Sequence, residues 1–214
     1  SVQEMADFVA LGFDLAFKYN KPAIILADGI IGQMMEKVVL PPFRPRRTEE
    51  EIRKQMPWAT QGKLAGHKRN VITSLELDPA IMEENNIRFQ AKYRKIEEAE
   101  VRYEEIGCEN ADYLMIAFGS MARICLKTQE MAIAEGIKVG VLRPITLWPF
   151  PSKIIAEYAN KVKGMISVEL NAGQMVEDIR LAVNGKVKVE HFGRLGGIVP
   201  TPDEVLNALK QKLM

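Results

Sequence analysis

Four short loops in the second half of the chain carry the residue types that could bind a ligand or take part in a reaction. Each loop follows an apolar stretch, and they are Gly119-Ser120, Arg143 to Pro151, Glu169 to Gln174, and His191 to Gly197. The candidate ligand or interface residues in these loops are Gly119, Ser120, Arg143, Trp148, Asn171, Gln174 and Arg194. Free backbone amides and guanidinium groups bind carboxylates and phosphates in many proteins.

Each of these candidates also has a structural interpretation. Gly119-Ser120 either begins a helix or binds an anion through free amides, and the first is favoured because no Gly-x-Gly-x-x-Gly pattern accompanies it. Asn171 is expected to cap a helix, whereas Gln174 is free to reach a ligand or a subunit. Arg194 could hold a carboxylate or phosphate through two parallel hydrogen bonds, or form a salt bridge between subunits.

The sequence contains no complete set of catalytic or metal-binding groups. Glu169 could act as an acid or base, but a single unpaired carboxylate is weak support for that role. Cys108 and Cys125 are too few for an iron–sulfur cluster or a thiolate zinc site, and we expect them to be buried thiols. His67 and His191 lie far apart and have no ligand spacing.

The loop from Arg143 to Pro151 is stiff and aromatic. Its three prolines fix φ and remove N–H donors, so it can neither continue a strand nor start a helix before Ser152. A rigid loop at the carboxyl end of a buried strand is where α/β proteins usually place contacts. We expect Trp148 and Phe150 to be buried against protein at a subunit interface, where aromatic anchors are enriched.

The elements that must position these loops are predicted from alternating patterns in residues 111–214. Apolar stretches at 113–118, 137–142, 164–168 and 187–190 alternate with helical segments that end near 135, 162 and 183, and a last helix starts at Thr201. This order predicts an α/β fold, a mostly parallel sheet with helices on both faces. Right-handed crossovers would then bring all four loops to one edge of the sheet.

The first half of the chain is less regular. Ser1 and Glu4 have the spacing of a capping box, which predicts a helix from residue 2, and Ala23 to Ala27 is predicted to be a fully buried strand. Asp78-Pro79 has the cap and first-turn proline of an amphipathic helix that we expect to run to about Ile106. Such a helix could strap its own domain or cover a partner subunit.

We divide the chain into three parts. Residues 1–40 are expected to be the end of a larger α/β domain, because one helix and one strand cannot form a core. Residues 41–110 form a linker that contains the long helix, and the basic stretch at 41–47 is a solvated connector or a contact with an acidic neighbour. Residues 111–214 form the α/β domain.

Composition excludes some classes of function. The chain has 214 residues and a net charge of +1, so no general attraction to nucleic acid or to an anionic membrane is expected. It contains no apolar run of membrane-spanning length and no visible signal peptide, although it starts at Ser1 and an upstream segment could be missing. We therefore expect a cytoplasmic protein.

Four motifs in order carry a resemblance to a known family. They are Phe118-Gly119-Ser120, Val141 to Pro151, Val168 to Gln174, and Gly193 to Gly197. Together they resemble the transketolase C-terminal-type domain of 2-oxoacid:ferredoxin oxidoreductase alpha subunits. Residues 1–28 and 36–41 look like the end of that subunit's thiamine-diphosphate pyrimidine-binding domain. Lys68 to Thr73 and Gln90 to Tyr93 are most similar to the branched-chain, 2-oxoisovalerate type.

The resemblance implies an activity and a set of partners. The family oxidatively decarboxylates a 2-oxoacid to an acyl-CoA, with electrons passing through iron–sulfur clusters to ferredoxin. It implies thiamine diphosphate and Mg²⁺ shared with a beta subunit, clusters on partner subunits, and further gamma and possibly delta subunits. Asp28-Gly29 is only a fragment of the Gly-Asp-Gly…Asn motif that holds the Mg²⁺-diphosphate. We therefore expect no catalytic residue and no bound cofactor in this chain alone.

Two other interpretations remain open at this point. The chain could belong to another thiamine-diphosphate enzyme, of the pyruvate dehydrogenase E1 beta or transketolase type, but the long segment 41–110 argues against it. It could also be a stand-alone assembly module that binds an anion at Gly119-Ser120 and Arg194.

Overall fold

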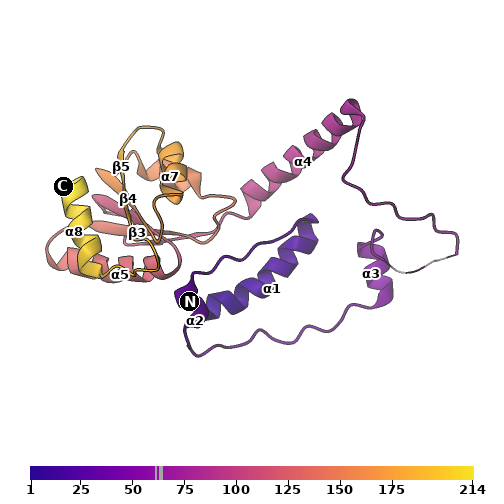
Figure 1. Cartoon of the computed structure of the whole chain (residues 1–214), viewed down its shortest axis with the longest axis horizontal. Coiled ribbons are helices and arrows are strands. Elements are labelled where there is room, and N and C mark those ends of the chain that lie inside the picture. The colour runs from indigo at the N-terminus through magenta and orange to yellow at the C-terminus, as the bar shows by residue number, and fades with distance from the viewer. Residues whose placement is uncertain (61, 63–64) are drawn as a thin grey trace.

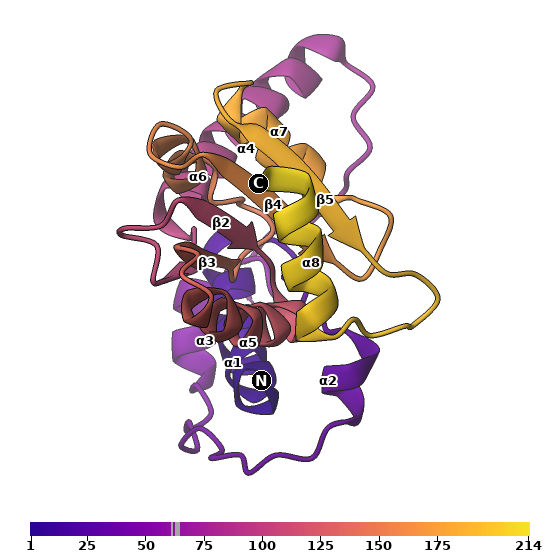
Figure 2. The ribbon, with the colours of Figure 1, turned by 90° about the vertical axis from the view of Figure 1, so that its left-hand side faces the viewer.

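A five-stranded sheet covered by helices on both faces forms the C-terminal half of the protein (Figures 1 and 2). The computed structural model describes residues 1–60, 62 and 65–214; residues 61, 63 and 64, within the predicted linker, lie outside this description. The strand order is β1-β3-β2-β4-β5. The strands are β1 (Tyr103–Ile106), β2 (Tyr113–Ile116), β3 (Val139–Pro144), β4 (Gly164–Glu169) and β5 (Lys188–Gly193).

The four strands predicted from the sequence pair in parallel, which confirms the predicted fold class. β2 pairs with β3 and β4, and β4 pairs with β5, all in parallel. The connecting helices are α5 (Gly119–Ala134), α6 (Ser152–Tyr158) and α7 (Met175–Val183), and α8 (Pro202–Leu213) closes the chain. The start of α6 at Ser152 is the boundary that the proline-rich loop predicts.

Alternation along the strands divides the core into two layers. Met115, Val141 and Ile166 face one side of the sheet, where they pack against α5 and α8. Leu114 and Leu142 face the other side, where they pack against α6 and α7. Figure 2 shows these pairs of helices on opposite sides of the sheet. Because both faces of the sheet are covered, the central strands β2, β3 and β4 are mostly apolar, and this apolar pattern is what predicted them from the sequence.

The predicted long helix ends earlier than the sequence suggests. Helix α4 spans Pro79–Ala99, and the chain then forms β1, which pairs with β3 in the antiparallel direction. The prediction that the helix continues to Ile106 is therefore wrong. β1 is an exposed edge strand with two glutamates in four residues, so its sequence lacks the apolar alternation of a covered strand.

The N-terminal residues form two helices and an extended stretch between them. Helix α1 spans Val2–Tyr19 and has the predicted capping box between Ser1 and Glu4, and α2 spans Gly29–Gln33. The prediction of a buried strand at Ala23 to Ala27 is wrong in this structure. These residues have no regular secondary structure, and Ile24 is 82% exposed. No strand among the described residues pairs with them.

Beyond Glu36, which still pairs with Arg123 of α5, the described residues up to 78 extend away from the α/β domain and include the short helix α3 (Glu49–Gln55) (Figure 1). The N-terminal end of α4 also projects away from the rest of the molecule in this view. Within the part of the chain that the structure describes, no helix is both long enough and apolar enough to cross a membrane.

Candidate functional site

A hollow of about 600 Å³ lies at the carboxyl ends of the central strands. The connections from β2 and β4 leave in opposite directions across the sheet, so the space outside their ends is the topological switch point. Open α/β sheets bind ligands at such a point. The lining includes Gly119 after β2, Arg143 in β3, and Asn171 after β4, together with Glu4 and Asp28 from the N-terminal segment.

The carboxylate of Asp28 occupies the helix start at Gly119-Ser120. The backbone N–H and the hydroxyl of Ser120 both donate to Asp28, each at 2.9 Å. The same carboxylate accepts hydrogen bonds from the amides of Ile30 and Ile31, so it caps α2 and α5 together. Burial alone would raise the pKa of Asp28, but these donors outweigh it and hold the pKa below its ordinary value.

The backbone of Gly119 fits this carboxylate closely. Its φ is +60°, and a Cβ built at this position would lie 2.8 Å from Asp28 Oδ2. The anion-binding interpretation of Gly119-Ser120 is thus realised within the chain: the bound anion is the chain's own Asp28. This contact joins residues 92 apart in sequence. In the sequence Asp28 was recognised only as part of a motif fragment, so its role as a cap was missed.

Arg143 makes a second contact between the N-terminal helix and the sheet. Its guanidinium donates to Glu4 at 2.7 Å and to Glu104 at 2.9 Å, and its side chain is 15% exposed. Burial lowers the pKa of Arg143, but the two carboxylates outweigh burial and raise the pKa. Nε of Arg143 donates to Glu104 and Nη2 donates to Glu4, so Arg143 links α1, β1 and β3.

Glu169 is a buried helix cap. Its carboxylate accepts hydrogen bonds from the amides of Gln174, Met175 and Val176 and from the hydroxyl of Ser167, at 2.6 to 3.1 Å. Burial would raise its pKa, but these four donors together hold the pKa below its ordinary value. A carboxylate held ionised by four donors is poorly suited to act as a general acid, and the contacts of Glu169 favour a structural role.

The expected cap at Asn171 is corrected by the same contacts. Asn171 Oδ1 accepts from the amide of Gly173 at 2.7 Å, which closes the loop before α7, and Glu169 caps the helix. The side chain of Gln174 is exposed, as expected for a residue free to reach a partner. Arg194 forms an ion pair with Glu204 of the same chain at 2.8 Å, and its contact with an anion or with another subunit stays a prediction.

In the loop from Arg143 to Pro151, here called the proline-aromatic loop, Trp148 packs against α4. Trp148 meets Tyr93 edge to face, with ring centroids 5.7 Å apart, yet its side chain is 57% exposed. Phe150 is partly buried against the α6–α7 layer. The predicted burial of Trp148 is therefore not reached within this chain, and its burial in a subunit interface remains a prediction.

A buried carboxylate joins the ends of helices α1 and α4. Glu100 is 4% exposed and accepts hydrogen bonds from Lys18 at 2.7 Å, the Tyr19 hydroxyl at 2.5 Å and Arg102 at 3.0 Å. Burial would raise its pKa, but the three donors lower it from 4.5 to about 2. The end of α1 is thus tied to the end of α4.

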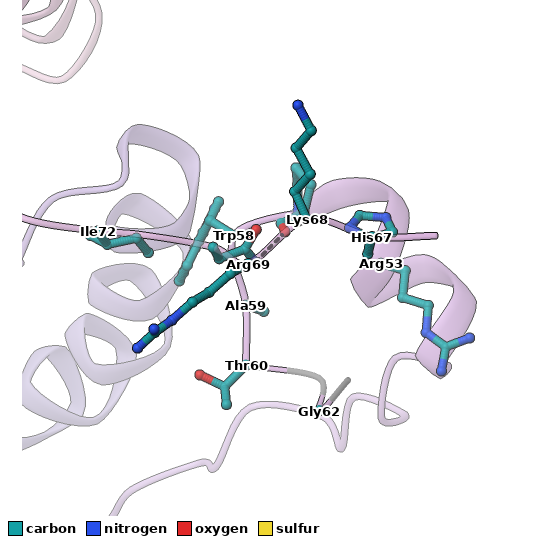
Figure 3. A pocket seen from close by; sticks show the side chains of 11 residues that line it. Arg53, Trp58, Ala59, Thr60, Gly62, His67, Lys68, Arg69 and Ile72 are labelled. Atoms are coloured by element: carbon teal, nitrogen blue, oxygen red, sulfur yellow. Dashed lines mark hydrogen bonds between the residues drawn. The ribbon is translucent and has the colours of Figure 1, made fainter. Parts of the chain in front are cut away.

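A second hollow, of about 750 Å³, lies in the extended segment around Trp58 (Figure 3). Arg53, Lys68 and Arg69 line it, but Figure 3 shows their charged ends pointing away from one another. Cations that diverge cannot surround a small anion. No group of three or more His, Cys, Asp or Glu residues that could hold a metal occurs among the described residues.

The fold and the hollow define a mostly parallel α/β domain with a site at the carboxyl edge of its sheet. Comparisons with known proteins find the same kind of domain. Residues 111–205 match the family described as pyruvate:ferredoxin oxidoreductase core domain II. A solved 2-oxoglutarate:ferredoxin oxidoreductase from Magnetococcus marinus, with 2-oxoglutarate, coenzyme A and succinyl-CoA bound, is similar to this chain with a TM-score of 0.57. It shares 26% identity over 65% of this chain and 24% of its own. Residues 111–205 thus form a core domain of this type.

Similarity to curated proteins covers nearly all of this chain. The chain is 44% identical over 211 residues to ketoisovalerate oxidoreductase subunit VorB of Methanothermobacter thermautotrophicus. It is 29% identical over 235 residues to 2-oxoglutarate synthase subunit KorA of Methanothermobacter marburgensis. The matches cover 99% and 98% of this chain but only 58% and 61% of those subunits. The chain is therefore similar to the VorB and KorA subunits along nearly all of its own length, and it spans about three fifths of theirs.

Proposed function

We propose that this chain is the latter part of an alpha subunit that acts on a branched-chain 2-oxoacid of the 2-oxoisovalerate type. The complete enzyme would decarboxylate the 2-oxoacid oxidatively, pass electrons to ferredoxin and give an acyl-CoA. The observation that carries the choice of substrate is the identity of 44% to VorB against 29% to KorA, over nearly the same residues of this chain.

Within that enzyme, the proposed role of this segment is assembly and support of the cofactor pocket. The switch-point hollow is lined by Asp28, Arg143 and Glu4, whose charged groups already pair within the chain. These contacts fasten residues 1–31 to the α/β domain. The loops at this edge of the sheet would therefore position the preceding domain, and the catalytic residues would lie elsewhere.

Residues 1–40 are proposed to be the end of a pyrimidine-binding domain. The apolar stretch Ala23 to Ala27 supports this, because Ile24 and Leu26 are 82% and 67% exposed although their pattern is that of a buried strand. A sheet of the preceding domain would cover them. The boundaries at residues 40 and 110 remain predictions.

Thiamine diphosphate and Mg²⁺ are proposed to be shared with a beta subunit, with none bound by this chain alone. When bound, thiamine diphosphate supplies the carbanion chemistry that removes CO₂ from a 2-oxoacid. The described residues contain no cluster of carboxylates or histidines that could hold the metal, so they do not fit it. Iron–sulfur clusters are likewise proposed to lie on partner subunits, and gamma and possibly delta subunits to complete the complex.

The substrate proposal is tested on the native complex, purified through an affinity tag after Met214. We expect coenzyme A-dependent reduction of ferredoxin or a viologen with 2-oxoisovalerate, at a kcat/KM at least about tenfold above that with 2-oxoglutarate. A preference for 2-oxoglutarate would contradict the branched-chain assignment. Reduction of lipoamide instead of ferredoxin would point to an E1-type enzyme.

A further inference from the structure

The extended segment carries a concentration of positive charge that the proposed activity does not use. Residues 41–70, here called the basic arm, contain eight Lys or Arg and three Glu, a net charge of +5. The whole chain has a net charge of only +1, so the other residues together carry −4. An arm of this charge is attracted to a surface of opposite sign.

The base of the basic arm is fixed on α1, whereas several of its cations have no ion-pair partner among the described residues. Arg44 forms an ion pair with Asp14, and Arg47 lies over the ring of Phe17, both on α1. Beyond these contacts, four exposed cations have no ion-pair partner among the described residues. They are Arg46, Lys54, Lys68 and Arg69. In Figure 3 the side chains of Lys68 and Arg69 point in different directions, which suits an extended surface rather than a small anion.

The next stretch of the chain has the opposite charge. Residues 75–87, here called the acidic tip, include Glu76, Asp78, Glu83 and Glu84, and no Lys or Arg occurs between Asn70 and Arg88. Figure 1 shows the N-terminal end of α4, which follows Glu76 and Asp78, projecting away from the α/β domain. Glu83 and Glu84 are exposed and have no ion-pair partner among the described residues.

Apolar side chains accompany both charged regions. Phe43 is 89% exposed and Trp58 44% exposed on the arm. Leu75, Leu77 and Ile87 are 71%, 83% and 62% exposed in or beside the tip. A combination of exposed apolar side chains with charged neighbours is typical of a protein–protein interface.

We propose that the basic arm of one copy of this chain docks on the acidic tip of a second copy. Charge complementarity between the two regions selects this occupant. A two-fold axis makes the contact twice, since each copy offers one arm and one tip. The proposal is independent of the substrate and of the catalytic assignment.

Charge reversal with exchange of partners tests this directly in the full chain. One variant carries Arg46→Glu, Lys68→Glu and Arg69→Glu, and the other carries Glu76→Lys, Glu83→Lys and Glu84→Lys. Sedimentation and native mass spectrometry should show a wild-type dimer that weakens in about 1 M salt, where the Debye length is about 3 Å. Each variant alone should dimerise at least about tenfold more weakly, and the two mixed should form a heterodimer of nearly wild-type affinity.

Two further proteins keep the test decisive. A chain with all six reversals should regain the homodimer, which shows that the single variants failed by charge and not by unfolding. Reversal of Lys138, Lys153 and Lys186, exposed lysines of the α/β domain, should leave the dimer unchanged. A monomeric wild type at low salt, or a mixture of the two variants that stays monomeric, would overturn the proposal.

Discussion

At the residue scale, the candidate site is built from carboxylates whose acceptor positions are used by the chain itself. Asp28 and Glu169 each receive four hydrogen bonds, mostly from helix-starting amides. Helix N-terminal amides favour a negative partner, and here intramolecular carboxylates supply it. The residues that looked available for ligands are thus largely engaged in holding elements together.

The role of Glu169 can be separated into stability and catalysis. Glu169→Gln should lower the free energy of unfolding by about 1–2 kcal/mol, because one of the amides it serves would then face an N–H₂ group. Urea denaturation measures this, with exposed Glu177→Gln as control. In the native complex, kcat should stay within about twofold. A loss of about a hundredfold in kcat without loss of stability would assign Glu169 an acid–base role after all.

Glu100 gives the structure a defined pH dependence. Its pKa is lowered from 4.5 to about 2 on folding, so the unfolded chain binds the proton more tightly. Its stabilising contribution is therefore complete above about pH 5 and is lost as the pH falls from about 4.5 to about 2.

Glu100→Gln should accordingly destabilise the chain by about 2 kcal/mol at pH 7 and progressively less below pH 5. Unfolding curves at several pH values, with exposed Glu97→Gln as the matched control, measure the difference. A variant that is equally destabilised at pH 7 and pH 3 would show that Glu100 acts through packing and not through its charge.

At the element scale, helices and strands covered on both sides were predictable, whereas elements defined by a distant neighbour were not. β2, β3 and β4 are apolar because both faces are buried. β1 contains Glu104 because it is an edge strand beside Arg143, a partner 39 residues away. The stretch at Ala23 to Ala27 has the local pattern of a strand but no described strand to pair with, and pairing rather than pattern makes a strand.

The attachment of the N-terminal helices depends on one carboxylate. Asp28→Asn replaces an acceptor by a donor that opposes the amide and hydroxyl of Ser120, and it weakens the caps of α2 and α5. We expect a loss of about 2 kcal/mol and faster amide hydrogen exchange in residues 28–33 and at the start of α5. Asp14→Asn, which removes only the exposed pair with Arg44, should change neither. If amide hydrogen exchange in Asp28→Asn were unchanged, Asp28 would not be the residue that holds α2 to the start of α5.

At the scale of the whole molecule, the sequence was more informative about family than about surface roles. The alternation of apolar and helical segments was sufficient to predict the fold class, and four motifs in order carried the resemblance to the family. The partners of Asp28, Arg143 and Arg194 depend on three-dimensional contacts between residues 10 to 139 positions apart, which spacing cannot reveal. Trp148 is 57% exposed and the apolar stretch at 23–27 is uncovered in this structure, and their burial against further protein stays a prediction.

The central claim is that this chain is architectural and that the chemistry lies in residues outside it. The most direct measurement is thiamine diphosphate binding with Mg²⁺ by calorimetry, together with 2-oxoisovalerate-dependent viologen reduction, for the isolated chain and for the native complex. We predict turnover by the complex, and neither binding nor turnover by the isolated chain. Turnover of a 2-oxoacid by the purified chain alone would contradict the account.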